Sequence, residues 1–100
     1  MRVSSTQQMQ IKQCIHQLLG NDVDIRVFGS RLDDHAKGGD LDLFIQSPRV
    51  LEQPAIISAR IAAQVSRLLY GRKVDVLLQA PNLRISPIHH VAQQQGQAIQ

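Results

Sequence analysis

Three aspartates stand in two segments that otherwise alternate between apolar and polar residues, Asp40 and Asp42 within 40–45 and Asp75 within 74–79. In a strand, residues two apart share a face at about 6.6–6.8 Å, and the neighbouring strand lies about 4.8 Å away. If the two strands are neighbours in a suitable register, the three carboxylates meet on one face and repel one another. A lysine or arginine side chain could neutralise them, and so could Mg²⁺ or Mn²⁺, which prefer clustered oxygen ligands and can be bridged in pairs.

A second segment that could do chemistry is Phe28-Gly29-Ser30, which directly follows another alternating segment at 23–28. Glycine lets the backbone approach a ligand closely, and the N–H groups that open a helical turn bind anions. A phosphate cradle beside a carboxylate cluster is typical of nucleotide chemistry. Neither feature identifies that chemistry alone, because Gly-Ser and Asp-x-Asp are both common.

Histidine, cysteine and tyrosine side chains elsewhere are interpreted as structural. Nothing in the spacing fixes a Ser-His-Asp geometry around His35. His89 and His90 are adjacent and point in different directions on a helix, so we expect both to be solvated. We expect Cys14 to be a buried helix residue, and Tyr70 to end a helix with its ring packed and its hydroxyl at the surface.

The elements that must position these residues follow from hydrophobic periodicity. Helical spacing predicts two helices, over 5–19 and from Pro54 until Gly71 closes the second, and alternation predicts strands over 23–28, 40–45 and 74–79. Ser86-Pro87 is typical of a helix start and predicts a terminal helix carrying Ile88, Val91 and Ala92. The expected order is α-β-(turn)-β-α-β-α, a three-stranded sheet with helices packed on its apolar face.

Composition limits the classes of protein to which the chain can belong. Its 100 residues suffice for one domain spanning 1–100, and an aliphatic core is expected because only Phe28, Phe44 and Tyr70 are aromatic. A single cysteine excludes a disulfide framework and favours the cytoplasm, and no apolar run approaches a membrane span. The net charge of +3 is scattered, so we expect no direct binding to nucleic acid. Helix faces outside the core could support a homo-oligomer, but no feature demands one.

Taken together, the motifs resemble those of the DNA polymerase β-like nucleotidyltransferase superfamily. That family carries an apolar residue followed by Gly-Ser, then a spacer, Asp-x-Asp, and a third acidic residue on a later strand. The matching segments are Phe28-Gly29-Ser30-Arg31, Asp40-Leu41-Asp42-Leu43 and Val74-Asp75-Val76. The compact length and the Gly-Ser-Arg start resemble the minimal nucleotidyltransferases (MNT) that prokaryotes encode beside HEPN-domain toxins. The resemblance covers about residues 11–96.

The resemblance implies an α+β fold, a small mixed sheet with helices packed on one face, as in the palm of polymerase β. It also implies catalytic roles for three carboxylates that hold two Mg²⁺ ions, those of Asp40, Asp42 and Asp75. Of these, Asp75 would complete the site of the ion that activates the attacking hydroxyl and would assist its deprotonation. The residues implied to bind the triphosphate of ATP are Gly29, Ser30 and Arg31.

The implied reaction is in-line attack of a hydroxyl on the α-phosphorus of a nucleoside triphosphate, with release of pyrophosphate. With ATP as donor and a HEPN toxin as acceptor, the chain would be a cytoplasmic protein adenylyltransferase and an antitoxin. Two alternatives remain open: transfer to a small molecule, as in aminoglycoside-type enzymes, or a non-catalytic antitoxin that covers its partner. The nine-residue spacer between Ser30 and Asp40 is shorter than the usual MNT form and favours the non-catalytic alternative.

Overall fold

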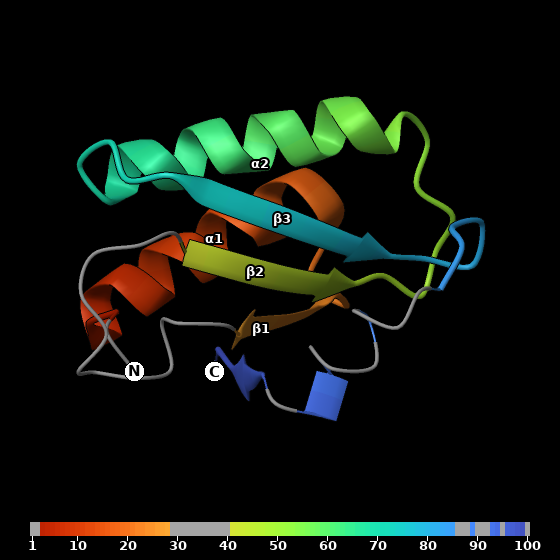
Figure 1. Ribbon diagram of the computed structural model, residues 1–100, viewed down its shortest axis with the longest axis horizontal. Coiled ribbons are helices and arrows are strands. Elements are labelled where there is room, and N and C mark those ends of the chain that lie inside the picture. Colours follow the sequence, from red (N-terminus) through yellow and green to blue (C-terminus); the bar gives the residue numbers. More distant parts are fainter. Residues whose placement is uncertain (1–2, 29–40, 86–88, 90–92, 95, 100) are drawn as a thin grey trace.

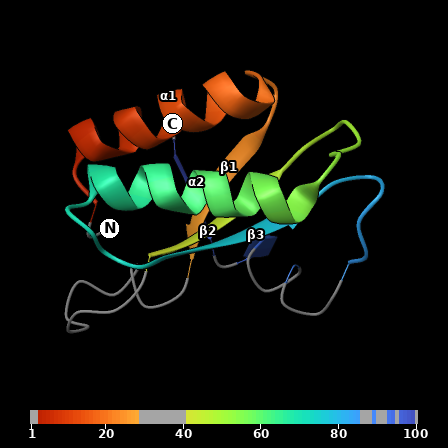
Figure 2. The same cartoon turned by 90° about the horizontal axis from the view of Figure 1, so that it is seen from above.

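The computed structural model describes residues 3–28, 41–85, 89, 93–94 and 96–99, which form two helices on one face of a four-stranded sheet (Figures 1 and 2). In chain order, the elements are α1 (Ser5–Leu19), β1 (Asp24–Phe28), β2 (Leu41–Gln46), α2 (Pro54–Leu68), β3 (Val74–Gln79) and β4 (Gln97–Ala98). The strand order is β3-β2-β1-β4, with β2 parallel to β3 and β1 antiparallel to both β2 and β4. The expected α+β class with a mixed sheet is therefore confirmed.

Helix α1 has the predicted bounds because its two ends are capped by side-chain and backbone hydrogen bonds. The Ser4 hydroxyl accepts from the Gln7 N–H at 3.1 Å, and the Gln7 side-chain oxygen accepts from the Ser4 N–H at 3.0 Å. This reciprocal pair is a capping box. At the other end, Gly20 adopts a φ of 99° and donates its N–H to the His16 carbonyl.

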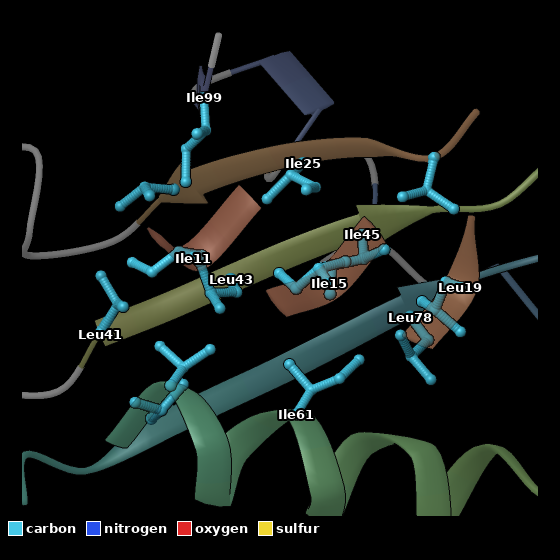
Figure 3. Packing of buried hydrophobic residues seen from close by; sticks show 14 of the residues in the cluster. Ile11, Ile15, Leu19, Ile25, Leu41, Leu43, Ile45, Ile61, Leu78 and Ile99 are labelled. Atoms are coloured by element: carbon cyan, nitrogen blue, oxygen red, sulfur yellow. The ribbon is translucent and has the colours of Figure 1, made fainter. Parts of the chain in front are cut away.

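The core lies between the sheet and the two helices and is built from aliphatic side chains. Figure 3 shows alternate side chains of β2 meeting those of α1 and α2. The fully buried residues at this contact are Ile11, Ile15, Leu41, Leu43, Ile45 and Ile61. No aromatic residue belongs to this cluster within the described part of the chain, which agrees with the expected aliphatic core. Neither of its helices is long and apolar enough to cross a membrane.

Helix α2 begins at Pro54 as predicted, but it ends at Leu68 through a cap that places Tyr70 in the left-handed conformation. Tyr70 has φ 60°, and its N–H donates to the Arg67 carbonyl at 3.3 Å, while the Gly71 N–H donates to the Ser66 carbonyl at 2.8 Å. This pair of bonds is the Schellman arrangement, in which glycine usually occupies the position of Tyr70. The prediction of a packed Tyr70 ring was wrong, because Tyr70 is 93% exposed.

Strand β4 was not predicted, because two residues are too few to show alternation. Gln97 and Ala98 pair with β1, and the Ile99 N–H donates to the Ile25 carbonyl at 2.9 Å. The Ile99 side chain is buried in the core. The polar sequence before it, rich in glutamine, gave no sign that the chain returns to the sheet edge.

The predicted terminal helix falls largely outside the described residues, which exclude Ile88, Val91 and Ala92. His89, on that segment, is buried rather than solvated, so that prediction was wrong. Its Nε2 lies 3.0 Å from the Leu78 carbonyl oxygen, and its ring meets the Phe44 ring edge-on at 5.9 Å between centroids. The His89 side chain thus covers part of the sheet face opposite the helices.

Candidate active site

The sheet face opposite the helices carries a row of residues from three strands. The β2–β3 register pairs Asp42 directly with Asp75, and the β1–β2 register pairs Phe28 with Asp42. Because alternation puts these residues on the same face as one another, the two carboxylates project side by side from neighbouring strands. The adjacency that the sequence argument required for a shared site is present in the structure.

The row lies at one end of the sheet, where β2 and β3 begin and β1 ends (Figure 1). The chain that leaves β1 continues into Gly29, Ser30 and Arg31, and the residue that enters β2 is Asp40. These four predicted site residues lie outside the residues that the structure describes. The structure therefore brings together Asp42 and Asp75, two of the three predicted carboxylates.

The pair formed by Asp42 and Asp75 has the chemistry of a cation site. Asp42 is half-buried and Asp75 is exposed, so both carboxylates are near solvent at the end of the sheet. Like charges directly opposite each other on neighbouring strands repel, and hard carboxylate oxygens suit Mg²⁺. In the described residues, no group of three or more histidine, cysteine, aspartate or glutamate side chains could hold a metal. The pair thus supplies two donors and fits a metal that takes further oxygen ligands from elsewhere.

A backbone hydrogen bond joins the start of β2, next to Asp42, to the turn between α2 and β3. The Leu41 N–H, between Asp40 and Asp42 in the sequence, donates to the Lys73 carbonyl at 3.0 Å. The bond extends the β2–β3 pairing to the first residue of β2. It fixes the start of β2 against the start of β3, and with it the register that sets Asp42 beside Asp75.

Farther along the same face, the sheet is covered rather than solvated. Phe44 lies two residues after Asp42 in β2 and is fully buried, and its register partner Leu77 is partly buried. His89 packs against Phe44 from outside the sheet. Sequence reasoning missed this cover, although Phe44 and Leu77 alternate in phase with the aspartates and so gave a sign of it.

The carboxylate at the opposite end of this face has a structural partner. Asp24 forms an ion pair with Arg26 at 2.8 Å. A hollow beside it is lined by residues that include Gln46, Ser47 and Gln79. Gln46 and Gln79 end β2 and β3, so this hollow lies a full strand length away from the aspartate pair.

Comparison with known proteins agrees with the geometry. A family model described as a nucleotidyltransferase domain matches residues 8–95, a span that includes all three motif segments. The chain therefore belongs to the nucleotidyltransferase domain family, within the polymerase β-like superfamily. Membership supports nucleotidyl transfer as the general class of reaction. The search of curated proteins found no match.

Proposed function

We propose that the chain transfers AMP from ATP to a hydroxyl of a HEPN toxin and thereby acts as its antitoxin. The observation that carries the proposal is the direct pairing of Asp42 with Asp75 across β2 and β3. Family membership supports the class of reaction. The choice of donor and partner follows from the resemblance of the Gly-Ser-Arg and Asp-x-Asp segments to those of minimal nucleotidyltransferases.

The proposed metal ligands are Asp40, Asp42 and Asp75. Two Mg²⁺ ions bound there would neutralise charge on the triphosphate and lower the pKa of the acceptor hydroxyl. Gly29 and Ser30 would hold the triphosphate through backbone and hydroxyl hydrogen bonds. The guanidinium of Arg31 would contact a phosphate oxygen.

In the proposed reaction, the acceptor hydroxyl oxygen attacks the α-phosphorus of ATP in line with the leaving group. A new P–O bond forms, the bond from the α-phosphorus to the oxygen that bridges the α- and β-phosphates breaks, and pyrophosphate leaves. We assign to the Asp75 carboxylate the acceptance of the proton from the attacking hydroxyl. The contribution of the chain is to position the reactants and to neutralise charge.

The position of β3 supports an acceptor that belongs to another chain. Within the described residues, β3 is the last strand on its side of the sheet. Asp75 is exposed there, so another molecule can approach its carboxylate from beyond the edge of the sheet. An ATP-dependent reaction with a protein partner also fits the cytoplasmic location expected from the single cysteine.

The test is transfer of AMP to the product of the neighbouring gene, which the proposal expects to be a HEPN-domain protein. The purified chain, its partner, ATP and Mg²⁺ are incubated, and mass spectrometry measures AMP added to the partner. We expect Asp42→Asn and Asp75→Asn to reduce the adduct at least about a hundredfold, because each removes a proposed metal ligand. Asp24→Asn is the matched control, since Asp24 lies on the same face at the other end of the sheet.

Three results would count against the proposal. No adduct in the wild type, with undiminished neutralisation of the partner by Asp42→Asn, would show a non-catalytic antitoxin. AMP on an aminoglycoside but not on the protein would show a small-molecule acceptor. An equal loss of adduct in Asp24→Asn would show that the loss does not arise at the aspartate pair.

A further inference from the structure

The turn between α2 and β3, residues 69–73, lies at the same end of the sheet as the aspartate pair (Figure 1). Its last residue is bonded through its carbonyl to the Leu41 N–H, and Asp75 follows two positions later. The turn therefore borders the proposed site on the side of Asp75. In the proposed reaction, this is the side from which the acceptor hydroxyl comes.

Tyr70, which caps the end of α2, is an unusual residue for this position in two ways. The residue is 93% exposed, although it carries one of only three Phe, Trp or Tyr side chains in the chain. Its backbone is left-handed, a conformation that is disfavoured for a bulky residue and that glycine adopts freely. Exposed aromatic rings contribute strongly to binding, and backbone outliers cluster where a surface has a function.

The turn is also positively charged. Arg72 and Lys73 are exposed in it, and Arg67 is exposed in the last turn of α2. Arg72 forms no ion pair with any described residue, whereas Arg26 and Arg49 are paired with aspartates. A surface of this kind attracts a partner with negative charge.

We propose that Tyr70 and Arg72 form the surface on which the acceptor protein docks, and that they select an acidic segment beside the acceptor hydroxyl. This proposal rests on the proposed function, because that function assigns the Asp75 side to the acceptor. A protein is favoured over RNA because the patch is small. RNA binding without sequence preference uses several stacking aromatic side chains along a basic groove, and this turn offers one ring.

The proposal can be tested by binding, without catalysis, using fluorescein-labelled random copolymers of tyrosine with glutamate or with lysine. Fluorescence anisotropy measures the affinity of each copolymer for the full chain. We expect Arg72→Glu to weaken binding of the Glu–Tyr copolymer about five- to tenfold and to strengthen binding of the Lys–Tyr copolymer. Arg60→Glu, an equal charge reversal at an exposed position of α2, should change neither affinity by more than about twofold.

Tyr70→Gly separates a docking role from a structural role. Glycine suits φ 60°, so the unfolding temperature should be unchanged or higher, while binding of the Glu–Tyr copolymer should weaken about fivefold. In transfer to the HEPN protein, Arg72→Glu and Tyr70→Gly should raise KM for the acceptor and leave kcat within about twofold. Asp42→Asn should bind the copolymer like the wild type.

The experiments distinguish failure of the docking surface from failure of the proposed function. Equal binding by Arg72→Glu and Arg60→Glu, or an unchanged acceptor KM in Arg72→Glu, would overturn the docking surface and leave the proposed function standing. Tighter binding of single-stranded oligo(A) than of the Glu–Tyr copolymer, lost in Arg72→Glu, would overturn the assignment of a protein partner. Absence of transfer by a wild-type chain that binds the copolymer through Arg72 would instead count against the proposed function.

Discussion

At the scale of residues, the pairing of Asp42 with Asp75 has opposite energetic effects with and without a cation. Two like charges directly opposite each other on neighbouring strands repel. A divalent ion bound between them would offset that repulsion, and its binding would add to the free energy of unfolding. Stability can therefore report the proposed metal site independently of activity.

We expect Asp75→Asn to abolish stabilisation by Mg²⁺. If Mg²⁺ is present at a hundred times its Kd, the wild type should gain about 2.7 kcal/mol in the free energy of unfolding. Asp75→Asn should gain less than about 0.5 kcal/mol, and without metal it should be no less stable than the wild type. Thermal unfolding with EDTA or MgCl₂ measures both effects, and Asp24→Asn is the control. An equal gain in Asp75→Asn would exclude Asp75 as a ligand.

Cys14 on α1 is partly buried rather than fully buried as expected, and this partial burial affects its thiol. Its Sγ donates to the Gln64 Oε1 at 2.9 Å, and desolvation raises the pKa of the thiol above its usual value. The folded chain therefore holds this proton to higher pH than the unfolded chain does. The contribution of the thiol to stability is complete below the unfolded pKa and is lost as pH rises through the folded pKa.

We accordingly expect the wild type to lose stability above about pH 9 more steeply than Cys14→Ala does. Urea unfolding at a series of pH values measures the difference in slope. DTNB should also react more slowly with the native chain than with the urea-unfolded chain at the same pH, because the thiolate is the reacting form. Parallel stability profiles for the two proteins would contradict this account of Cys14.

At the scale of elements, the junction between α1 and β1 depends on the absence of a side chain at Gly20. A Cβ there would lie 2.7 Å from Arg49 Nη2, and Gly20 has φ 99°. Arg49 occupies this space because its Nη1 pairs with Asp22 at 2.9 Å and its Nη2 donates to the Leu19 carbonyl. The guanidinium thus closes the carboxyl end of α1 and ties it to the segment after β2.

We expect Gly20→Ala to destabilise the chain by about 2–3 kcal/mol, through backbone strain and displacement of Arg49. Gly71→Ala is the matched control, because Gly71 has φ 86° but no atom within 4 Å of the added Cβ. Strain alone should cost that variant about 1–2 kcal/mol. Urea unfolding measures the free energy of unfolding of both variants. Equal losses of stability in the two would show that displacement of Arg49 contributes nothing to the effect of Gly20→Ala.

The elements that the sequence predicted well are those specified by local chemistry. The bounds of α1 follow from the Ser4 cap and Gly20, and β3 follows from alternation over 74–79. Strand β4 and the burial of His89 depend on contacts between distant parts of the chain, with Arg26 and with Phe44, which alternation and capping do not encode. The left-handed Tyr70 was missed because Gly71 was interpreted as the stop signal.

For the candidate site, the sequence identified the residues but could not supply their arrangement. Alternation placed Asp42 and Asp75 on the polar face of their strands, but it could not show that β2 and β3 are parallel neighbours. The register comes from the packing of Leu43 and Ile45 against the helices, because a slip of one residue would turn these side chains away from the core.

At the scale of the whole molecule, the fold separates its stability from its chemistry. The aliphatic core lies between the sheet and the helices, and the aspartate pair lies on the opposite face. Folding therefore depends on burial of apolar side chains, and we expect it not to require occupancy of the proposed metal site.

We expect EDTA to abolish AMP transfer and to leave the far-UV circular dichroism spectrum and the hydrodynamic size unchanged. Added Mg²⁺ should restore at least about nine-tenths of the activity, since the metal-free chain stays folded. Leu43→Ala is the contrast, because it opens a cavity in the core and should cost about 2–5 kcal/mol whether or not metal is present. Loss of the helical spectrum in EDTA would refute this separation.

The central position of β2 has a consequence for the tolerance of the chain to mutation. On one face of β2, the odd-numbered residues Leu41, Leu43 and Ile45 are buried against the helices. On the other face, Asp42 lies in the candidate site and Phe44 packs against His89. Consider a library of all single substitutions in which protein abundance and activity are measured separately. Substitutions at the odd-numbered positions of β2 should lower abundance. Substitutions of Asp42 should lower activity without lowering abundance. Substitutions of Phe44 should lower both abundance and activity. One strand would thus show two kinds of genetic intolerance in alternation, with the period of the β-pleat.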